Sequence, residues 1–185
     1  MDFLQNRVAI ITGGAGAIGR AMAFTFSKLG AKLVICGTNE QKTRDFVSEL
    51  KSEGREAISA IADVADFDQV TRMVEKSIEA FGKIDILVNN AVARGTRDYR
   101  KKTTLEIDKS EWDRIIGVNL TGIFNCSKLV IPWMIKAGGG NILNISSMAA
   151  KTGGLINDIH YVASKAGMGG MTKKLAREFG PQKIR

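Results

Sequence analysis

A tyrosine and a lysine near the end of the chain have the types and the spacing to transfer a proton. Tyr161 and Lys165 lie four residues apart in a run, 159–179, that has a helical pattern, so we expect both side chains on one helix face. A phenol, with an ordinary pKa of about 10, is a poor acid or base at neutral pH, but a neighbouring ammonium stabilises its phenolate form. Tyr161 is therefore a candidate proton donor to a carbonyl oxygen, or acceptor from an alcohol. The alternative is an ordinary helix, on which the tyrosine packs and the lysine is solvated.

A glycine-rich run near the start of the chain has the pattern of a dinucleotide-binding turn. It follows an apolar stretch at 8–11 and precedes a helical pattern. Glycines allow a tight turn and a close approach of the pyrophosphate, and the following helix offers free N–H groups to the phosphates. The run matches the Gly-x-Gly-x-x-Gly fingerprint, and the residues predicted to bind the cofactor here are Gly13, Gly14, Gly16, Ile18 and Gly19. An ordinary glycine-rich turn is the alternative.

Apolar strand patterns alternate with helical patterns along the whole chain. We expect strands at 8–12, 32–36, 57–61, 84–88 and 141–145, and helices at 18–29, 38–53, 66–81, 111–137 and 159–179. Thr38 and Gln41 have the spacing of a capping box, Gly82 is a stop signal, and Pro132 predicts a kink or an early break. The fold class is therefore α/β, a single Rossmann-like domain whose doubly wound parallel sheet has helices on both faces. The glycine-rich turn would lie at the switch point where such sheets bind ligands.

The composition indicates one soluble, cytoplasmic domain. With 185 residues, 44% of them hydrophobic, the chain can bury one sizeable core. No apolar run is expected to approach the length that spans a membrane, and the first six residues do not resemble a signal peptide. Cys36 and Cys126 are expected to be reduced core residues, and a single histidine predicts no metal site. The net charge of +8 is spread along the helices, which favours a solvated face over a nucleic-acid site.

Six motifs occur in the order that is typical of one enzyme family. They are the glycine-rich turn at 12–19, Asp63-Val64, Asn89-Asn90-Ala91, Asn119, Ser146-Ser147, and Tyr161 with Lys165. Each motif alone is common, but six in order are specific. From residue 7 to residue 185 the chain resembles the short-chain dehydrogenase/reductase family, and within it the branch of 3-oxoacyl carrier-protein reductases. The resemblance implies an NAD(P)-dependent oxidoreductase that interconverts a carbonyl and a secondary alcohol.

The resemblance also implies a role for each residue of a catalytic set made of Asn119, Ser147, Tyr161 and Lys165. Lys165 would hold the nicotinamide ribose, Ser147 would bond the reacting oxygen, with Ser146 as the weaker alternative, and Asn119 would hold a water for proton relay. Other interpretations are a turn cap for the serines and a satisfied helix-interior amide for Asn119. His160 is expected on a different helix face from Tyr161, as a lining or surface residue.

The choice between NADP and NAD depends on the end of the second strand. Gly37 stands where NAD-preferring members of the family carry Asp, and Thr38 where NADP-preferring members often have Arg. Nothing there repels a 2′-phosphate, since Glu40 is expected inside the next helix, so the sequence favours NADP over NAD. The resemblance further implies that Asp63 and Val64 contact the adenine and that Asn90 and Ala91 line the cofactor.

The chain also departs from the family pattern. Ala17 and Val92 replace glycines, which predicts crowding near the pyrophosphate and the nicotinamide. The basic run at 94–102 is expected either to form a solvated loop or to attract anionic substrates. The final strand-helix-strand portion of the family fold is missing, so we expect a truncated chain. Non-catalytic dinucleotide binding, or an inactive truncated form, is the alternative function. The expected partners are a small carbonyl or alcohol substrate and further copies of the chain, in a homodimer or homotetramer built through the helices at 111–137 and 159–179.

Overall fold

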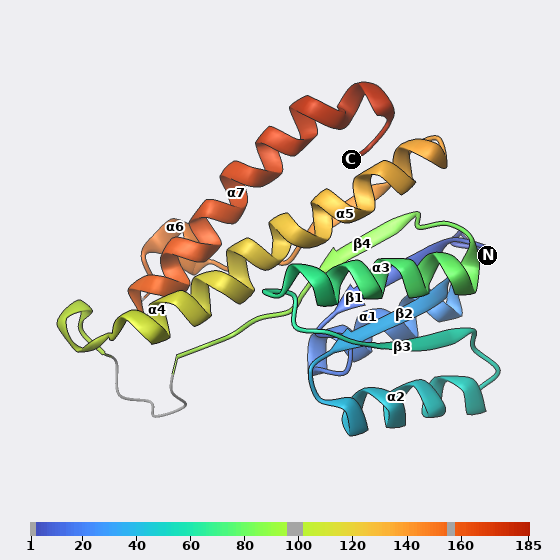
Figure 1. Ribbon diagram of the computed structural model, residues 1–185, viewed down its shortest axis with the longest axis horizontal. Coiled ribbons are helices and arrows are strands. Elements are labelled where there is room, and N and C mark those ends of the chain that lie inside the picture. The colour runs from blue at the N-terminus through green and yellow to red at the C-terminus, as the bar shows by residue number, and fades with distance from the viewer. Residues whose placement is uncertain (1–2, 96–101, 155–157) are drawn as a thin grey trace.

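Five parallel strands form one sheet in the order β3-β2-β1-β4-β5. The computed structural model describes residues 3–95, 102–154 and 158–185 (Figure 1), and most of the basic run at 94–102 lies outside them. The strands are β1 (Val8–Thr12), β2 (Lys32–Gly37), β3 (Ala57–Ile61), β4 (Ile86–Asn89) and β5 (Asn141–Asn144). This order, in which β1 and β4 meet at the centre, confirms the predicted doubly wound fold.

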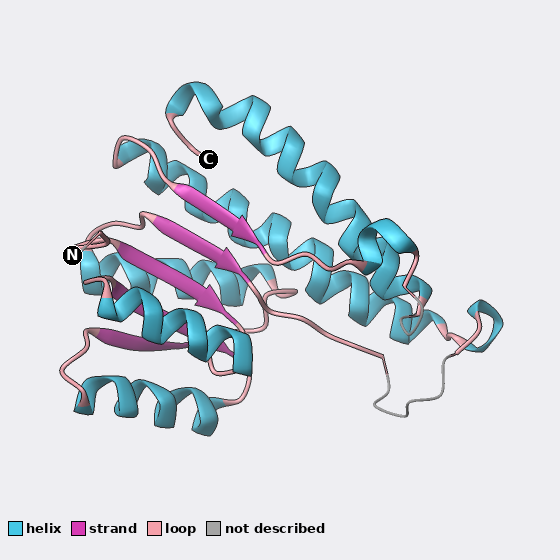
Figure 2. Ribbon diagram, turned by 180° about the vertical axis from the view of Figure 1, so that it is seen from behind, coloured by secondary structure: helices cyan, strands magenta, loops and turns pink. Residues whose placement is uncertain are grey.

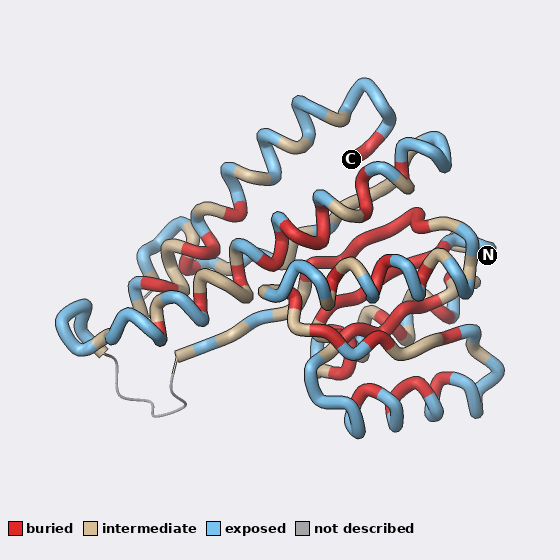
Figure 3. The backbone as a smooth tube through the Cα atoms, viewed as in Figure 1, coloured by how far each residue is buried: buried red, intermediate tan, exposed pale blue. Residues whose placement is uncertain are grey.

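Helices cover both faces of the sheet (Figure 2). Because alternate residues of a strand point to opposite faces, Ile11 packs with the helices α1 (Ala17–Lys28) and α2 (Glu40–Ser52), while Ile10 packs with α3 (Phe67–Phe81) and α5 (Gly122–Lys136). All five residues of β1 are buried, as expected for a central parallel strand. The red strands in Figure 3 mark this core between the two helical layers.

The capping residues at the helix ends agree with the sequence at α3, but one predicted cap, at α2, is wrong. Asp66 accepts a hydrogen bond from the Gln69 backbone at the start of α3, and Gly82, with φ of 75°, ends that helix as predicted. The predicted capping box at Thr38 is wrong. Asn39 is the cap, since its Oδ1 accepts from the Lys42 backbone at 2.8 Å, and an Asn caps a helix at least as well as a Thr.

The predicted helix at 111–137 consists of three consecutive segments. It begins as α4 (Lys109–Ile116), passes through a π-helical turn (Gly117–Thr121) and continues as α5. Pro132 lies inside α5, which continues to Lys136, so the predicted early break is wrong.

This helical run, Lys109–Lys136, is long and apolar enough to cross a membrane by length and composition, with a mean hydropathy of 1.4 in its most apolar window. The expectation that no run reaches that length is therefore wrong. Half of the window is buried inside the protein, where α5 contributes core residues that contact the sheet and α3. Cys126 is one of them, and both cysteines are free and buried as predicted. Burial raises the pKa of Cys36 to about 12.

The end of the chain lies beside β5, at the edge of the sheet. A short helix, α6 (Ala149–Thr152), precedes the long helix α7 (Ile159–Phe179), and single 3-10 turns lie at Thr104–Glu106 and Gly180–Gln182. The backbone of Arg185 accepts from Ile142 at 2.8 Å and donates to Gly140 at 3.0 Å. The final residues therefore pair with the start of β5, while the far half of α7 is mostly exposed (Figure 3).

Candidate active site

The glycine-rich turn leaves little room for side chains, as two of its glycines illustrate. Gly13 has φ of 61°, and a Cβ there would lie 3.0 Å from the Ala91 Cα and 3.1 Å from the Asn90 Nδ2. A Cβ on Gly19 would lie 2.5 Å from the Gly13 carbonyl oxygen. Glycine tolerates both conditions, so the run folds as the tight strand-to-helix turn that its sequence predicts.

Hydrogen bonds join this turn to the end of β4. The Thr12 hydroxyl accepts from the backbone N–H groups of Asn90 and Ala91, each at 3.0 Å. The Asn90 amide donates to the Thr12 carbonyl at 2.9 Å. Asn90 and Ala91 thus lie beside the glycine-rich turn, and their predicted contact with the cofactor stays a prediction. Thr12 was missed as an organiser of this switch point, although its place at the end of the first strand was visible in the sequence.

The turn suits a phosphate-bearing dinucleotide. Gly16 is the N-cap of α1 and offers no side chain to the first N–H groups of the helix, which leaves them free for an anion. Ile18 is 56% exposed in that first turn, and Ala17 is exposed beside it. The residues present therefore fit the group that the glycine pattern predicts.

The ends of β2 and β3 flank the same edge of the sheet. Thr38 is exposed after β2, and Glu40 lies in the first turn of α2 as predicted, paired with Arg44 at 2.5 Å. The Asp63 carboxylate accepts from the Ala65 backbone at 2.9 Å. Val64 is buried against the position of Gly122, so its side chain belongs to the core and only its backbone is left for the predicted adenine contact.

The predicted proton-transfer pair lies on one face of α7. The Lys165 Nζ is 5.9 Å from the centroid of the Tyr161 ring and donates to the Ile145 carbonyl at 2.6 Å. Lys165 is only 3% exposed. Burial, with a smaller contribution from the charge of Arg94, lowers the pKa of this ammonium to about 8. The spacing of four residues thus places a desolvated cation beside the phenol.

The low pKa of Lys165 predicts a pH dependence of stability. The pKa of this ammonium is about 8 in the folded protein, whereas that of an unperturbed lysine is 10.5. Between these pH values the unfolded chain binds more protons, so stability rises with pH across this window, by at most about 1.4 kcal/mol per pH unit for one proton. Denaturant unfolding of wild type and Lys165→Met at several pH values measures it. An identical pH dependence in the two proteins would contradict the assignment.

Asn119 is buried in the π-helical turn and is bonded within the protein. Its Oδ1 accepts from the Ala93 N–H at 2.7 Å, and its Nδ2 donates to the Ala93 carbonyl at 2.9 Å and to the Ser164 hydroxyl at 3.3 Å. The Ser164 hydroxyl in turn donates to the Tyr161 carbonyl at 2.8 Å. Asn119 thus matches the satisfied amide that was the alternative interpretation. Ser164, which was not predicted, links it to the turn that carries Tyr161.

The two serines after β5 differ in their surroundings. Ser147 is half-buried and its hydroxyl accepts from the Ala149 N–H at 3.2 Å at the start of α6, whereas Ser146 is exposed. Ser147 therefore caps a turn, which was its alternative role. An accepting hydroxyl keeps its own proton, so this bond leaves Ser147 able to donate to a ligand oxygen.

His160 is not a surface residue, contrary to one of the two expectations for it. It is fully buried, with its Nε2 3.6 Å from the Glu111 carboxylate on α4. The first turn of α7 packs against α4 at this point, which turns the histidine inward.

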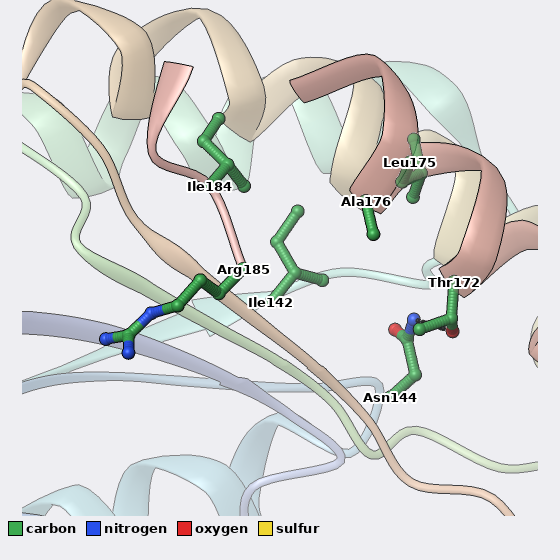
Figure 4. Close-up of a pocket in the computed structure, with 7 residues that line it drawn as sticks. All are labelled: Ile142, Asn144, Thr172, Leu175, Ala176, Ile184 and Arg185. Carbon is green, nitrogen blue, oxygen red and sulfur yellow. Dashed lines mark hydrogen bonds between the residues drawn. The ribbon is translucent and has the colours of Figure 1, made fainter. Parts of the chain in front are cut away.

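A shallow hollow at the β5 edge lies apart from these residues. Among the described residues it is lined from β5, α7 and the chain end, with Ile142, Leu175 and Ile184 forming its apolar part (Figure 4). Asn144 and Thr172 are joined by a hydrogen bond of 2.9 Å at one side of it. None of the predicted site residues lines this hollow.

Comparisons with known proteins agree with this arrangement. The model of the family described as short chain dehydrogenase matches residues 7–185. The chain is 36% identical to a 3-oxoacyl-[acyl-carrier-protein] reductase of Thermotoga maritima, covering 98% of the chain and 72% of that protein. It is 40% identical to a subunit of (2S)-[(R)-hydroxy(phenyl)methyl]succinyl-CoA dehydrogenase of Thauera aromatica, covering 96% of the chain and 68% of that protein.

A solved structure shows the same fold. A 3-oxoacyl-[acyl-carrier protein] reductase from Brucella melitensis, with bound NAD, superimposes with a TM-score of 0.93 at 35% identity, covering 100% of the chain and 70% of that structure. The resemblance carried by six ordered motifs is thereby confirmed over nearly the whole chain. The chain belongs to the short-chain dehydrogenase/reductase family of NAD(P)-dependent enzymes.

Proposed function

We propose that the protein interconverts a carbonyl and a secondary alcohol, with Tyr161 as the acid and base. The observation that carries this proposal is the desolvated Lys165 ammonium 5.9 Å from the Tyr161 ring. When bound, the nicotinamide dinucleotide supplies or accepts the hydride of the reaction. Tyr161 would give its phenolic proton to the carbonyl oxygen in reduction and take a proton from the alcohol in oxidation.

The other site residues would orient the reactants. Ser147 keeps a hydroxyl proton to donate to the reacting oxygen, and Lys165 provides a positive charge next to Tyr161 and donors for ribose hydroxyls. Asn119 would have a structural role, because its bonds to Ala93 and Ser164 hold the loop after β4 against α7. The proposed cofactor contacts are the glycine-rich turn with Ile18, Thr38, Asp63, the Val64 backbone, Asn90 and Ala91.

NADP is the proposed preferred cofactor. Thr38 is exposed where a 2′-phosphate would approach, and Glu40, the acidic residue closest to it in sequence, is already paired with Arg44. An acidic residue bonded to the ribose hydroxyls would favour NAD. Gly37 provides none, so the charge balance at this strand end favours the phosphorylated cofactor.

An acyl thioester is the proposed substrate class. The relatives from Thermotoga maritima and Thauera aromatica carry an acyl carrier protein or CoA in their names, and the net charge of +8 suits a phosphorylated carrier. We also propose a cytoplasmic protein that assembles as a homodimer or homotetramer through α5 and α7. Exposed apolar side chains such as Phe124 and Ile135 on α5 support an association surface there.

A substrate panel tests the proposed function. We expect nicotinamide absorbance to fall with acetoacetyl-CoA and NADPH, at least tenfold faster than with NADH, and to change little with sugars and NADPH or with polyols and NADP⁺. Equal rates with both cofactors would contradict the NADP preference. If the cofactor binds but no carbonyl reacts with NADPH and no alcohol reacts with NADP⁺, the non-catalytic binding module is favoured instead.

A further inference from the structure

Three side chains with metal-binding atoms meet between α4 and the start of α7. Glu111 lies on α4, and Asp158 and His160 lie at the N-terminus of α7. One ligand atom from each lies within 4.8 Å of the other two. The residues are 47 or more positions apart across α4 and α7 in the sequence, so no sequence spacing revealed the group.

Three buried polar atoms in this group have no hydrogen bond within the described part of the chain, although the His160 Nε2 and the Glu111 Oε1 face each other at 3.6 Å. Among the described residues, neither ring nitrogen of His160 has a hydrogen bond, and the same is true of the Glu111 Oε1. His160 is fully buried and Glu111 is 8% exposed. Leaving a buried polar group without a hydrogen bond is unfavourable, and such groups commonly mark a missing ion or water. These atoms without hydrogen bonds point to a ligand between them.

The distance between the histidine nitrogen and the glutamate oxygen suits a first-row divalent cation. Zn²⁺ binds nitrogen and carboxylate oxygen at about 2.0–2.2 Å in a tetrahedron, which places neighbouring ligand atoms roughly 3.4 Å apart. The His160 Nε2 and the Glu111 Oε1 are 3.6 Å apart. An imidazole ligand disfavours Mg²⁺ and Ca²⁺, which take oxygen ligands.

Gly95, in the chain before α4, lies beside the same group of side chains. A Cβ on Gly95 would lie 2.5 Å from the Asp158 Oδ2 and 3.3 Å from the Glu111 Oε1, so a larger residue there would occupy the space beside both carboxylates. The Lys102 backbone also donates to the Asp158 Oδ1 at 3.3 Å. Each carboxylate thus has one oxygen bonded to Lys102 and the other beside Gly95.

We propose that Glu111, Asp158 and His160 form a binding site for a divalent cation of the Zn²⁺ type. The cation would join α4 to the first turn of α7, next to Tyr161. This proposal does not depend on the proposed reaction, because none of the three residues is assigned a part in it.

The charge of Lys102 lowers the affinity of this site for a cation, so its removal tests the proposal. Its Nζ lies 2.5 Å from the Glu111 Oε2, so its positive charge repels a cation held by the other oxygen. Across about 5 Å in water, a unit charge and a divalent cation repel by roughly 1.7 kcal/mol. Removing the charge with Lys102→Met should therefore tighten cation binding by roughly tenfold or more.

Cobalt binding measures the site independently of activity. The protein is prepared without a polyhistidine tag, stripped of metal with a chelator and titrated with Co²⁺. The visible absorption of bound Co²⁺ indicates a site with a low coordination number. We expect one Co²⁺ per chain, displaced by Zn²⁺, and a rise in unfolding temperature with Zn²⁺. The absorption should be lost in His160→Gln and Glu111→Gln, and binding should tighten in Lys102→Met.

A neighbouring acid on the same helix is the matched control. Asp113 lies on α4 but is exposed and paired with Lys109, so Asp113→Asn should bind Co²⁺ like wild type. Absence of the absorption in wild type, or equal binding by wild type and Glu111→Gln, would overturn the proposal. If His160→Gln fails to fold, as judged by circular dichroism, the opposite shifts in Glu111→Gln and Lys102→Met decide the question.

Discussion

Replacing Tyr161 with Phe is expected to reduce turnover by roughly 10³-fold, the size of effect that a positioned general acid or base contributes. The substitution removes only the hydroxyl, so the ring keeps its place near the Lys165 ammonium. Among the described residues no hydrogen bond to that hydroxyl is present, so its removal should leave stability nearly unchanged. The loss should fall on the rate of the chemical step.

Two measurements separate this effect from misfolding. NADPH affinity, followed by fluorescence titration, should be within about twofold of wild type, and the circular dichroism spectrum should be unchanged. Turnover that survives the substitution would exclude Tyr161 as the proton donor. A parallel loss of NADPH affinity would instead indicate that the tyrosine serves binding.

Replacing Lys165 with Met is expected to reduce both turnover and cofactor affinity, with turnover lower by at least about 10²-fold. Methionine has a similar length, so it preserves the packing of a side chain that is 3% exposed. It removes the charge beside Tyr161 and the donor to the Ile145 carbonyl. The variant therefore tests the ammonium rather than the shape of the side chain.

Lys165→Arg is the matched control for charge. It restores the positive charge with a different donor geometry, so we expect part of the cofactor affinity and little of the turnover to return. Steady-state kinetics and NADPH titration of both variants measure this. If Lys165→Met kept wild-type turnover, the cation would have no part in the reaction.

The sheet and its helices could be predicted because their patterns are local. Buried strands such as β1 are continuous apolar runs, and a helix like α3 shows its face every three to four residues and ends at Gly82. The first residues of helices were harder to predict. Thr38 and Asn39 are adjacent cap formers, and which of them caps α2 depends on the backbone at the end of β2.

The candidate site could be predicted only in part, for a related reason. Tyr161 and Lys165 are four residues apart, so helical geometry alone places them together. The Thr12 to Asn90 bonds span 78 residues and the Asn119 to Ser164 bond spans 45. Such contacts depend on how strands and helices meet, which no local pattern records. The inward position of His160 has the same origin.

The π-helical turn at Gly117–Thr121 gives one continuous helix two orientations. A π turn holds an extra residue compared with an α turn, and each residue of an α-helix advances by about 100°. The residues before the turn are therefore out of phase with those after it: α4 packs against α7, while α5 packs against α3 and β4. A helical wheel drawn through the whole run would misplace Glu111 relative to Cys126. Sequence alignments of this region can thus require a one-residue gap inside an unbroken helix.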